Sequence, residues 1–489
     1  MPLLYCYYGD DFTGSTDVLE QLAVNGVSSV LFLTMPTPAQ LARFSDRQAI
    51  GFAGDARSRT PEWMSAHLPA IFTRIRDLAP AIVHYKVCST FDSAPHRGSI
   101  GRALEIGREV FATQTVPIGV GAPHLGRFLV FGNLFAAAGS EIYRIDRHPT
   151  MAHHPSTPMH EADLRLHLAG QTKLAVGLVD LRAFHAGKVQ EQFRLQAEGG
   201  AAAILLDGLD AGMLQRAGQL IWELKQVSQP LFTIGSSGVT ASLMGYWRSA
   251  GMIAAEPRYV TAKGTDQILV ISGSCSAVTA GQILWAERHG YTCIELDAAA
   301  LAGGGSHAVE AAARLALRSL SSGHDTVLYT ALGSPAGVTH DKELGHALGR
   351  LLLGVVQQSG VRRVVLCGGD TSSHAIQQLD LIALTFAGIL APGAPLCRAH
   401  AEEASGLDGL ELVLKGGQIG REDFLELRAR GVMGRWKRHS GVVTNKVLPS
   451  RAVKRKRRRR IPRIIFPRLL EPLPSKRSRW VPRLWRSES

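Results

Sequence analysis

The sequence predicts an α/β protein of two domains, each built on a mostly parallel sheet, with a ligand cleft between them. Two observations predict this fold: 489 residues exceed what one compact core usually holds, and short apolar runs alternate with helical patterns along most of the chain. The alternation is interrupted at residues 246–266, where Pro257 and Gly264 stand among scattered apolar positions. We therefore expect an N-terminal domain at 1–245, a linker at 246–266 and a C-terminal domain at 267–431.

The individual elements follow from the length and period of the apolar runs. Strands are expected in the first domain at residues 3–8, 29–33, 50–53, 82–86, 128–131, 174–179 and 203–206. In the second domain, strands are expected at 268–271, 293–296, 327–329, 364–367 and 410–414, with helices near 277–288, 308–320 and 342–356 and a closing helix from about Arg421.

The C-terminal tail, residues 432–489, differs from the rest of the chain. Residues 435–489 hold 19 of the 54 lysines and arginines but only Glu471 and Glu488 of the 41 acids, so this stretch has a net charge of +17 and the preceding residues −4. Arginine and proline recur in it without a helical or strand period, which predicts a solvated, disordered segment. An arm that binds nucleic acid, or an extension without function, remain alternatives for the tail.

The six cysteines are scattered and none forms a CxxC pair, which indicates reduced thiols in a reducing compartment. No apolar run approaches about 18 residues, the length of a membrane-spanning helix, and the N-terminus lacks the pattern of a signal peptide. We expect a cytoplasmic protein that does not bind a membrane.

The segment Tyr8–Asp17 is the first candidate site. It places Asp10, Asp11, Thr13 and Gly14 between an apolar strand and an amphipathic helix that ends at Asn25-Gly26. Loops at the carboxyl ends of strands in α/β sheets collect ligands, and helix N-termini attract anions. The two aspartates suggest a base for a hydroxyl or a ligand for Mg²⁺, although either residue could simply cap the helix.

Two further polar clusters belong to the first domain. Residues 84–93 place Lys86, Ser89, Thr90 and Asp92 after a strand, a set suited to the carboxylate and hydroxyls of a sugar acid. The stretch 147–159 is rich in proline and histidine and includes His154. Several histidines close together could indicate a zinc site, but no HExxH spacing occurs. We therefore predict no metal site formed by the protein alone.

Three strand-to-loop junctions in the second domain are rich in glycine and hydroxyl side chains. They are Ser272–Ser276, which includes Ser274; Gly368-Gly369-Asp370-Thr371-Ser372; and Lys415-Gly416-Gly417. Such loops let backbone N–H groups approach phosphates, so together they predict one nucleotide site. Each could alone be an ordinary tight turn. Neither GxxxxGK[ST] nor a strand-associated GxGxxG occurs.

Taken in order, these motifs resemble those of the four-carbon acid sugar kinases. The resemblance covers roughly residues 3–430 and rests on Asp10–Gly14, Lys86–Asp92, His154–Met159, Ser272–Ser276, Gly368–Thr371 and Lys415–Gly417. Two loops depart from the family pattern as follows: the third reads Lys-Gly-Gly-Gln-Ile-Gly rather than Lys-Ser-Gly-Asn-Phe-Gly, and the second reads Gly-Gly-Asp rather than Gly-Gly-Glu. These departures leave the substrate open, and the tail has no counterpart in the family.

The resemblance implies ATP-dependent phosphorylation of a tetronate, 3-oxo-tetronate or similar acid, with Mg²⁺ as the accompanying ion. The implied ATP contacts are Ser274, Gly368, Gly369, Asp370, Thr371 and Gly417. The implied acid-sugar site includes Thr13, Gly14, Ser89, Thr90, Asp92 and His154, with Asp10, Asp11 and Lys86 in catalytic roles. The resemblance does not decide whether Asp10 or Asp11 is the base. A homodimer is one possible oligomeric state.

Two other functions, each of a different class of protein, are also compatible with the sequence. One is a protein that binds nucleic acid through residues 451–460, which removal of the tail would test because a kinase would keep its activity. The other is a sugar-acid dehydrogenase, which two α/β domains would also suit. The missing GxGxxG pattern counts against the dehydrogenase.

Overall fold

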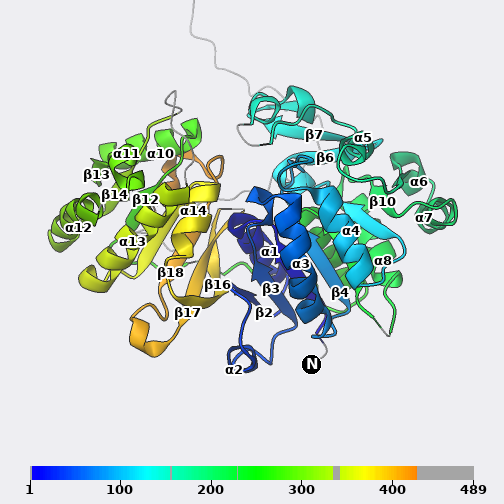
Figure 1. The fold of residues 1–489 in the computed structure, drawn as a ribbon, viewed down its shortest axis with the longest axis horizontal. Coiled ribbons are helices and arrows are strands. Elements are labelled where there is room, and N and C mark those ends of the chain that lie inside the picture. The colour runs from blue at the N-terminus through cyan, green and yellow to red at the C-terminus, as the bar shows by residue number, and fades with distance from the viewer. Residues whose placement is uncertain are drawn as a thin grey trace, which may run out of the picture. The chain divides into compact units, whose positions relative to one another are not determined.

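The computed structural model describes residues 3–154, 157–227, 229–260, 262–304, 306–333, 342–391 and 393–426. Within these ranges the chain forms a 15-stranded sheet and a separate three-stranded sheet, with helices packed on the large sheet (Figure 1). The predicted α/β class is confirmed. The basic tail at 432–489 and the expected end of the second domain at Gly431 lie outside the described residues.

The N-terminal half contributes a parallel sheet in the order β2-β3-β1-β4-β11-β5-β10-β9. Its strands are β1 (Tyr5–Gly9), β2 (Ser29–Phe32), β3 (Ala49–Ala53), β4 (Ile82–Lys86), β5 (Val116–Gly119), β9 (Val176–Val179), β10 (Ala203–Leu206) and β11 (Leu231–Gly235). Its helices are α1 (Phe12–Val24), α2 (Pro38–Ala42), α3 (Pro61–Arg76), α4 (Ile100–Val110), α5 (Leu164–Ala169), α6 (Leu181–His185), α7 (Val189–Glu198), α8 (Ala211–Glu223) and α9 (Ser237–Ser249).

The run at residues 128–131 does not join the parallel sheet. It falls in β6 (Arg127–Val130), which pairs antiparallel with β7 (Asn133–Ala138), and β7 pairs with β8 (Glu141–Arg144). The turn explains the difference, because Phe131 and Gly132 both have positive φ, at 52° and 78°, as a tight two-residue hairpin requires. The buried carboxylate of Asp207 accepts hydrogen bonds from both backbone N–H groups, at 2.6 and 3.0 Å.

The C-terminal half contains β12 (Leu269–Ser272), β13 (Thr292–Glu295), β14 (Thr326–Tyr329), β15 (Arg363–Cys367), β16 (Leu381–Ala391), β17 (Ala394–Ala401) and β18 (Glu411–Lys415). Its helices are α10 (Ala277–Arg288), α11 (Ala298–Ala302), α12 (Ser306–Ser321), α13 (Lys342–Ser359) and α14 (Gly369–Ile376). The expected closing helix is a 3₁₀ turn over Glu422–Leu425 as far as the described residues extend.

The sheets of the two halves are joined into one. β13-β14-β12-β15-β18 are parallel, β17 and β16 follow as an antiparallel hairpin, and β16 pairs antiparallel with β2 (Figure 1). The pairing of β16 with β2 is short, matching Ala383 with Phe32 and Leu384 with Leu31. One further backbone bond, from Leu33 N to Ile382 O at 3.1 Å, extends it.

In both halves the strand order reverses beside the strand that precedes the first candidate loop. β1 lies between β3 and β4, and β12 lies between β14 and β15. Loops at the carboxyl ends of strands flanking such a reversal form the usual binding crevice of an open α/β sheet. The loops after β1 and β4 in one half, and after β12 and β15 in the other, therefore occupy the expected binding positions.

The expected linker starts within the last turn of α9, which ends at Ser249. The domain limits 1–245, 246–266 and 267–431 stay predictions. None of the helices in the described ranges combines the length and the apolar character needed to cross a bilayer.

Close packing of α8 on α9 generates a stability prediction. A Cβ at Gly218 would lie 1.9 Å from the carbonyl oxygen of Ser242, whereas a Cβ at Gly281 in α10 meets nothing within 4 Å. Gly218→Ala should therefore destabilise the protein by about 1–3 kcal/mol through forced backbone separation. Gly281→Ala should stabilise it by roughly 0.5–1 kcal/mol, because alanine restricts the unfolded chain and favours helix. Thermal unfolding followed by circular dichroism measures both, and equal shifts would contradict the packing described.

Candidate active site

Asp10 and Asp11 lie where β1 passes into α1, and their side chains have different surroundings. Asp11 is the N-cap of α1: its Oδ1 accepts a hydrogen bond from Gly14 N at 3.0 Å. Its Oδ2 forms an ion pair with Arg57. Asp10 is buried, and its Oδ1 has no hydrogen-bond partner among the described residues. The helix therefore uses Asp11 for its start and leaves Asp10 with a free oxygen.

Arg57 is a site residue that the sequence did not reveal. It lies in a 3₁₀ turn (Ala56–Ser58) after β3, the neighbour of β1, and its backbone N–H donates to the carbonyl oxygen of Asp10 at 3.1 Å. Burial alone would lower the pKa of Arg57, but the carboxylates of Asp11, Asp10 and Asp92 raise it well above its usual value. The one feature of the sequence that could have indicated Arg57 is its position just after the carboxyl end of an apolar strand.

Lys86 at the end of β4 is the second cation of this group. It is only 2% exposed, and its Nζ donates to Val87 O at 3.0 Å. The chain passes close to it at Gly14, where a Cβ would lie 2.9 Å from Lys86 Nζ and 2.4 Å from Asp11 Oδ1. A side chain at position 14 would therefore displace the lysine ammonium or the capping carboxylate from its present place.

Asp92 is the centre of a hydroxyl-rich group in the loop after β4. Its carboxylate accepts hydrogen bonds from Thr90 Oγ1 and, at 3.1 Å, from Thr157 Oγ1. Thr157 is also 3.2 Å from Nδ1 of His154. Burial would raise the pKa of Asp92, but Arg57, His154 and the two hydroxyls lower it below its usual value, so the group is an anion. Ser89 lies in the same loop and is half-buried.

The pKa of Asp10 differs from that of its neighbours. Burial raises it to about 7, Arg57 and Lys86 oppose that rise, and Asp11 and Asp92 add to it. A carboxyl with a pKa near neutrality and an unused oxygen can accept a proton from a hydroxyl, which a capped and ion-paired carboxylate such as Asp11 does poorly.

The three glycine-rich loops of the C-terminal half converge. A Cβ at Gly273 would lie 2.5 Å from Thr371 Cγ2, one at Gly368 3.3 Å from Ser274 N, and one at Gly417 3.0 Å from Ser274 Oγ. Gly368 has φ +113°, and Gly369, Asp370 and Thr371 form the first turn of α14. The loops therefore bring backbone N–H groups and a helix N-terminus to one place, as binding of phosphates requires.

Buried polar side chains hold the third of these loops. Lys415 is fully buried, and its Nζ donates to Thr279 Oγ1 and to Gly416 O, both at 3.1 Å. Thr279 Oγ1 in turn donates to Gly417 O at 3.0 Å. Burial lowers the pKa of Lys415. This chain of bonds fixes the backbone of Gly417 against α10.

The two groups meet along α1. Its first turn follows Asp11, and a Cβ at Gly416 would lie 3.8 Å from Thr13 Cγ2. Further along the helix, Glu20 Oε2 accepts a hydrogen bond from Gly393 N at 2.9 Å. α1 also contacts α14, so one helix links the aspartates of one half to the glycine loops of the other.

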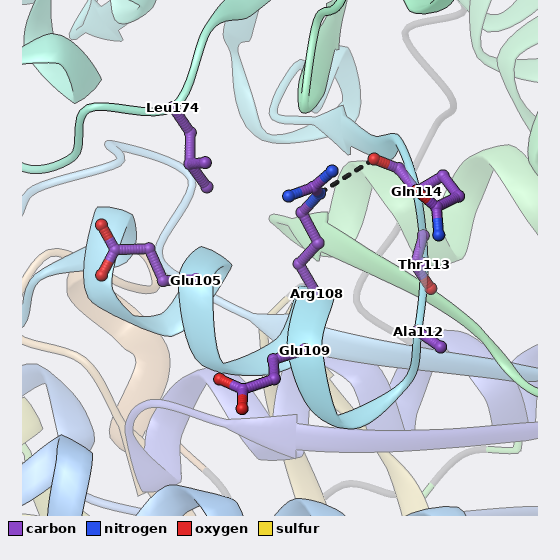
Figure 2. Close-up of a pocket in the computed structure, with 7 residues that line it drawn as sticks. All are labelled: Glu105, Arg108, Glu109, Ala112, Thr113, Gln114 and Leu174. Carbon is purple, nitrogen blue, oxygen red and sulfur yellow. Dashed lines mark hydrogen bonds between the residues drawn. The ribbon is translucent and has the colours of Figure 1, made fainter.

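The pocket drawn in Figure 2 is not part of this arrangement. It has a volume of about 430 Å³ and is lined by Glu105, Arg108, Glu109, Ala112, Thr113, Gln114 and Leu174. Arg108 Nε donates to Gln114 O at 2.9 Å across it. Six of these residues lie in α4 or between α4 and β5, and Leu174 precedes β9, so the pocket lies at the amino ends of these strands, whereas Asp10 and Lys86 lie at carboxyl ends. None of its residues belongs to either group above.

Among the described residues, no group of three or more histidine, cysteine, aspartate and glutamate side chains is arranged to hold a metal ion. His154 contributes to the Asp92 group instead.

The chain matches two domain families in the expected order. Residues 5–243 match the sugar-binding N-terminal domain, and residues 269–425 match the nucleotide-binding C-terminal domain. A solved structure, Haemophilus influenzae protein HI1011, is 26% identical with a TM-score of 0.64, over 86% of this chain and 98% of that one.

Curated relatives match along nearly their whole length. The 3-oxo-isoapionate kinase of Paraburkholderia graminis is 41% identical over 447 residues, which are 88% of this chain and 94% of the relative. The 3-oxo-tetronate kinase of Pseudomonas fluorescens is 32% identical over 439 residues, 86% of this chain and 95% of the relative. Neither the nucleic-acid-binding alternative nor the dehydrogenase alternative gains support from these matches. The chain belongs to the four-carbon acid sugar kinase family.

Proposed function

We propose that this kinase transfers the γ-phosphoryl group of ATP to a hydroxyl of a small 3-oxo sugar acid, with Asp10 as the base. The observation that supports this most strongly is the placement of α1, which begins at Asp11 and contacts Gly416 and Gly393 of the other half. Phosphoryl transfer depends mainly on positioning and on charge stabilisation, and a helix shared by both groups positions one relative to the other.

The acid would be held by cations and hydroxyls of the N-terminal half. Arg57 and Lys86 would neutralise its carboxylate, and arginine suits this role because its guanidinium can donate two parallel hydrogen bonds. Asp92, with Thr90 and His154 beside it, would accept from the substrate's hydroxyls, and Thr13, Gly14 and Ser89 would line the same loops. Asp11 would orient Arg57 rather than accept a proton, because both of its oxygens are engaged.

The phosphates would lie against the loops at Ser274, Gly368 and Gly417, with Gly369, Asp370 and Thr371 at the N-terminus of α14. In the transfer, the hydroxyl oxygen forms a bond to the γ-phosphorus as the bond to the bridging β–γ oxygen breaks. The hydroxyl proton passes to Asp10 Oδ1 and ADP leaves. Mg²⁺, when bound with ATP, would neutralise charge on the phosphate oxygens, and the unpartnered buried carboxylate oxygen of Asp17 fits such an ion.

We further propose 3-oxo-isoapionate as the preferred acid, since the kinase of that name is 41% identical and the 3-oxo-tetronate kinase 32% identical to this chain. The cytoplasmic location also stays a proposal, favoured by six cysteines that are all free thiols. A homodimer remains a prediction.

ADP release tests the activity. With Mg²⁺ and ATP, we expect turnover on 3-oxo-isoapionate with a higher kcat/KM than on 3-oxo-tetronate, and no turnover by Asp10→Asn at equal folding. ADP release on neither acid by an enzyme that binds ATP would contradict the proposed substrates. Turnover of both acids by Asp10→Asn at the wild-type rate would contradict the proposed base.

The pKa of Asp10 generates a pH prediction. Below about pH 7 the free enzyme would carry a protonated Asp10 that cannot accept the substrate's proton, so kcat/KM should rise with pH through about 7 and then level off. The pKa of Asp10 is higher in the folded protein than in the unfolded chain. The free energy of unfolding therefore falls as pH rises through 7 and the folded protein loses this proton. The melting temperature of Asp10→Asn should therefore exceed that of wild type above pH 8. A flat kcat/KM profile between pH 5.5 and 9 would argue for another base.

Gly368 provides a test of the nucleotide site. Its φ of +113° is unfavourable for any residue with a side chain, so Gly368→Ala should distort the loop and weaken ATP binding by about tenfold or more. Gly354→Ala is the matched control, since a Cβ there meets nothing within 4 Å. Calorimetry measures ATP affinity in both variants, and unchanged affinity in Gly368→Ala would place the phosphates elsewhere.

A further inference from the structure

One face of α1 is turned toward the nucleotide-binding half. Thr13, Asp17 and Glu20 share that face because they are spaced by four and three residues along the helix. Thr13 approaches Gly416, and Glu20 accepts a hydrogen bond from Gly393 N at 2.9 Å. Asp17 therefore lies between two contacts with the half that holds the glycine-rich loops.

Asp17 is a buried carboxylate with one unpartnered oxygen. It is 7% exposed, its Oδ1 has no hydrogen-bond partner, and it forms no ion pair with any described residue. Asp11 on the same helix has both oxygens engaged. An uncompensated buried carboxylate is costly, so a charged buried side chain of this kind is usually completed by a cation.

The two acids on this face differ in their partners. Glu20 Oε2 accepts the hydrogen bond from Gly393 N, whereas Asp17 Oδ1 has no partner among the described residues. Asp10 has the other unpartnered carboxylate oxygen at the start of this helix, but Arg57 and Lys86 surround it with positive charge. That environment suits a base and disfavours a divalent cation, whereas Asp17 has no such cation beside it.

We propose that Asp17 is the protein's ligand for the divalent metal ion that enters with the nucleotide, an assignment that rests on the proposed function. ATP would bring several negative charges toward Gly368 and Gly417, and Asp17 belongs to the helix that contacts α14 and β18, the elements next to these loops. Mg²⁺ commonly takes one or two carboxylates and completes its shell with phosphate oxygens and water. A single carboxylate also agrees with the lack of any three-ligand cluster in the described parts of the chain.

Binding of AMP-PCP, an ATP analogue that is not hydrolysed, tests the assignment without turnover. Calorimetry on the full-length protein would give the AMP-PCP affinity in EDTA and in Mn²⁺, and the electron paramagnetic resonance signal of free Mn²⁺ would report metal uptake. Wild type should bind AMP-PCP more tightly with Mn²⁺. Asp17→Asn should lose that gain by about tenfold or more, since carboxylates around a bound metal strongly affect its affinity, and should bind equally well in EDTA.

Several outcomes would overturn the assignment. A metal-dependent gain in Asp17→Asn equal to that of wild type would remove Asp17 from the metal's ligands. An equal loss in EDTA and in Mn²⁺ would make its role structural. Absence of AMP-PCP binding by wild type under both conditions would instead contradict the proposed nucleotide site, so the two failures are distinguishable.

Three further variants guard the interpretation. Glu20→Gln, which can still accept from Gly393 N, should keep the gain in Mn²⁺. His124→Gln should keep it too. The Asp17 carboxylate opposes the lowering of the His124 pKa by burial, so a simple Asp17–His124 pair would make the two variants behave alike. Asp17→Cys should regain affinity for AMP-PCP in Cd²⁺ but not in Mg²⁺, since thiolates favour soft metals. Loss of the gain in Glu20→Gln or His124→Gln, or no response of Asp17→Cys to Cd²⁺, would contradict the assignment.

Discussion

The short antiparallel pairing of β2 with β16 is the constraint on which the rest of the site depends. It matches only Phe32 with Ala383 and Leu31 with Leu384, yet it joins two parallel sheets edge to edge. Strand pairing fixes both register and face, because a shift of one residue would turn every side chain to the other side. The register therefore determines that α1 packs against β16, β17, β18 and α14.

Charge balance explains why the acid-sugar side of the site needs Arg57. Asp10, Asp11 and Asp92 are all buried, and Lys86 alone could not compensate them. Arg57, which is paired to Asp11, lowers the pKa of Asp92 together with His154 and two hydroxyls, while burial still holds the pKa of Asp10 near 7. Neighbouring carboxylates thus acquire different protonation states from their surroundings, which is how one site can provide both an anchor and a base.

Local sequence predicted the parts of this molecule that local physics determines. Asp11 caps α1, Gly14 and Gly368 stand where a side chain would clash or strain the backbone, and the helix expected at 277–288 is α10. Arg57 was not predicted as a site residue, because it belongs to no motif and comes close to Asp10 and Asp11 only when β3 pairs with β1. The pairing of β2 with β16 was not predicted, because strands about 350 residues apart leave no local pattern in the sequence. The strand β6 was assigned to the wrong sheet, because an apolar run does not reveal which strand it pairs with.

In the proposed mechanism, α1 holds the sugar-acid site next to the nucleotide site, so that the γ-phosphoryl group passes directly from ATP to the acid. A crystal structure with AMP-PCP, Mg²⁺ and 3-oxo-isoapionate tests it most directly. We expect phosphates against Gly368 and Gly417, the acid against Arg57 and Lys86, and an acceptor hydroxyl between Asp10 and the γ-phosphorus. Finding the acid elsewhere, such as in the pocket lined by Glu105 and Arg108, or the γ-phosphate turned away from α1, would contradict it.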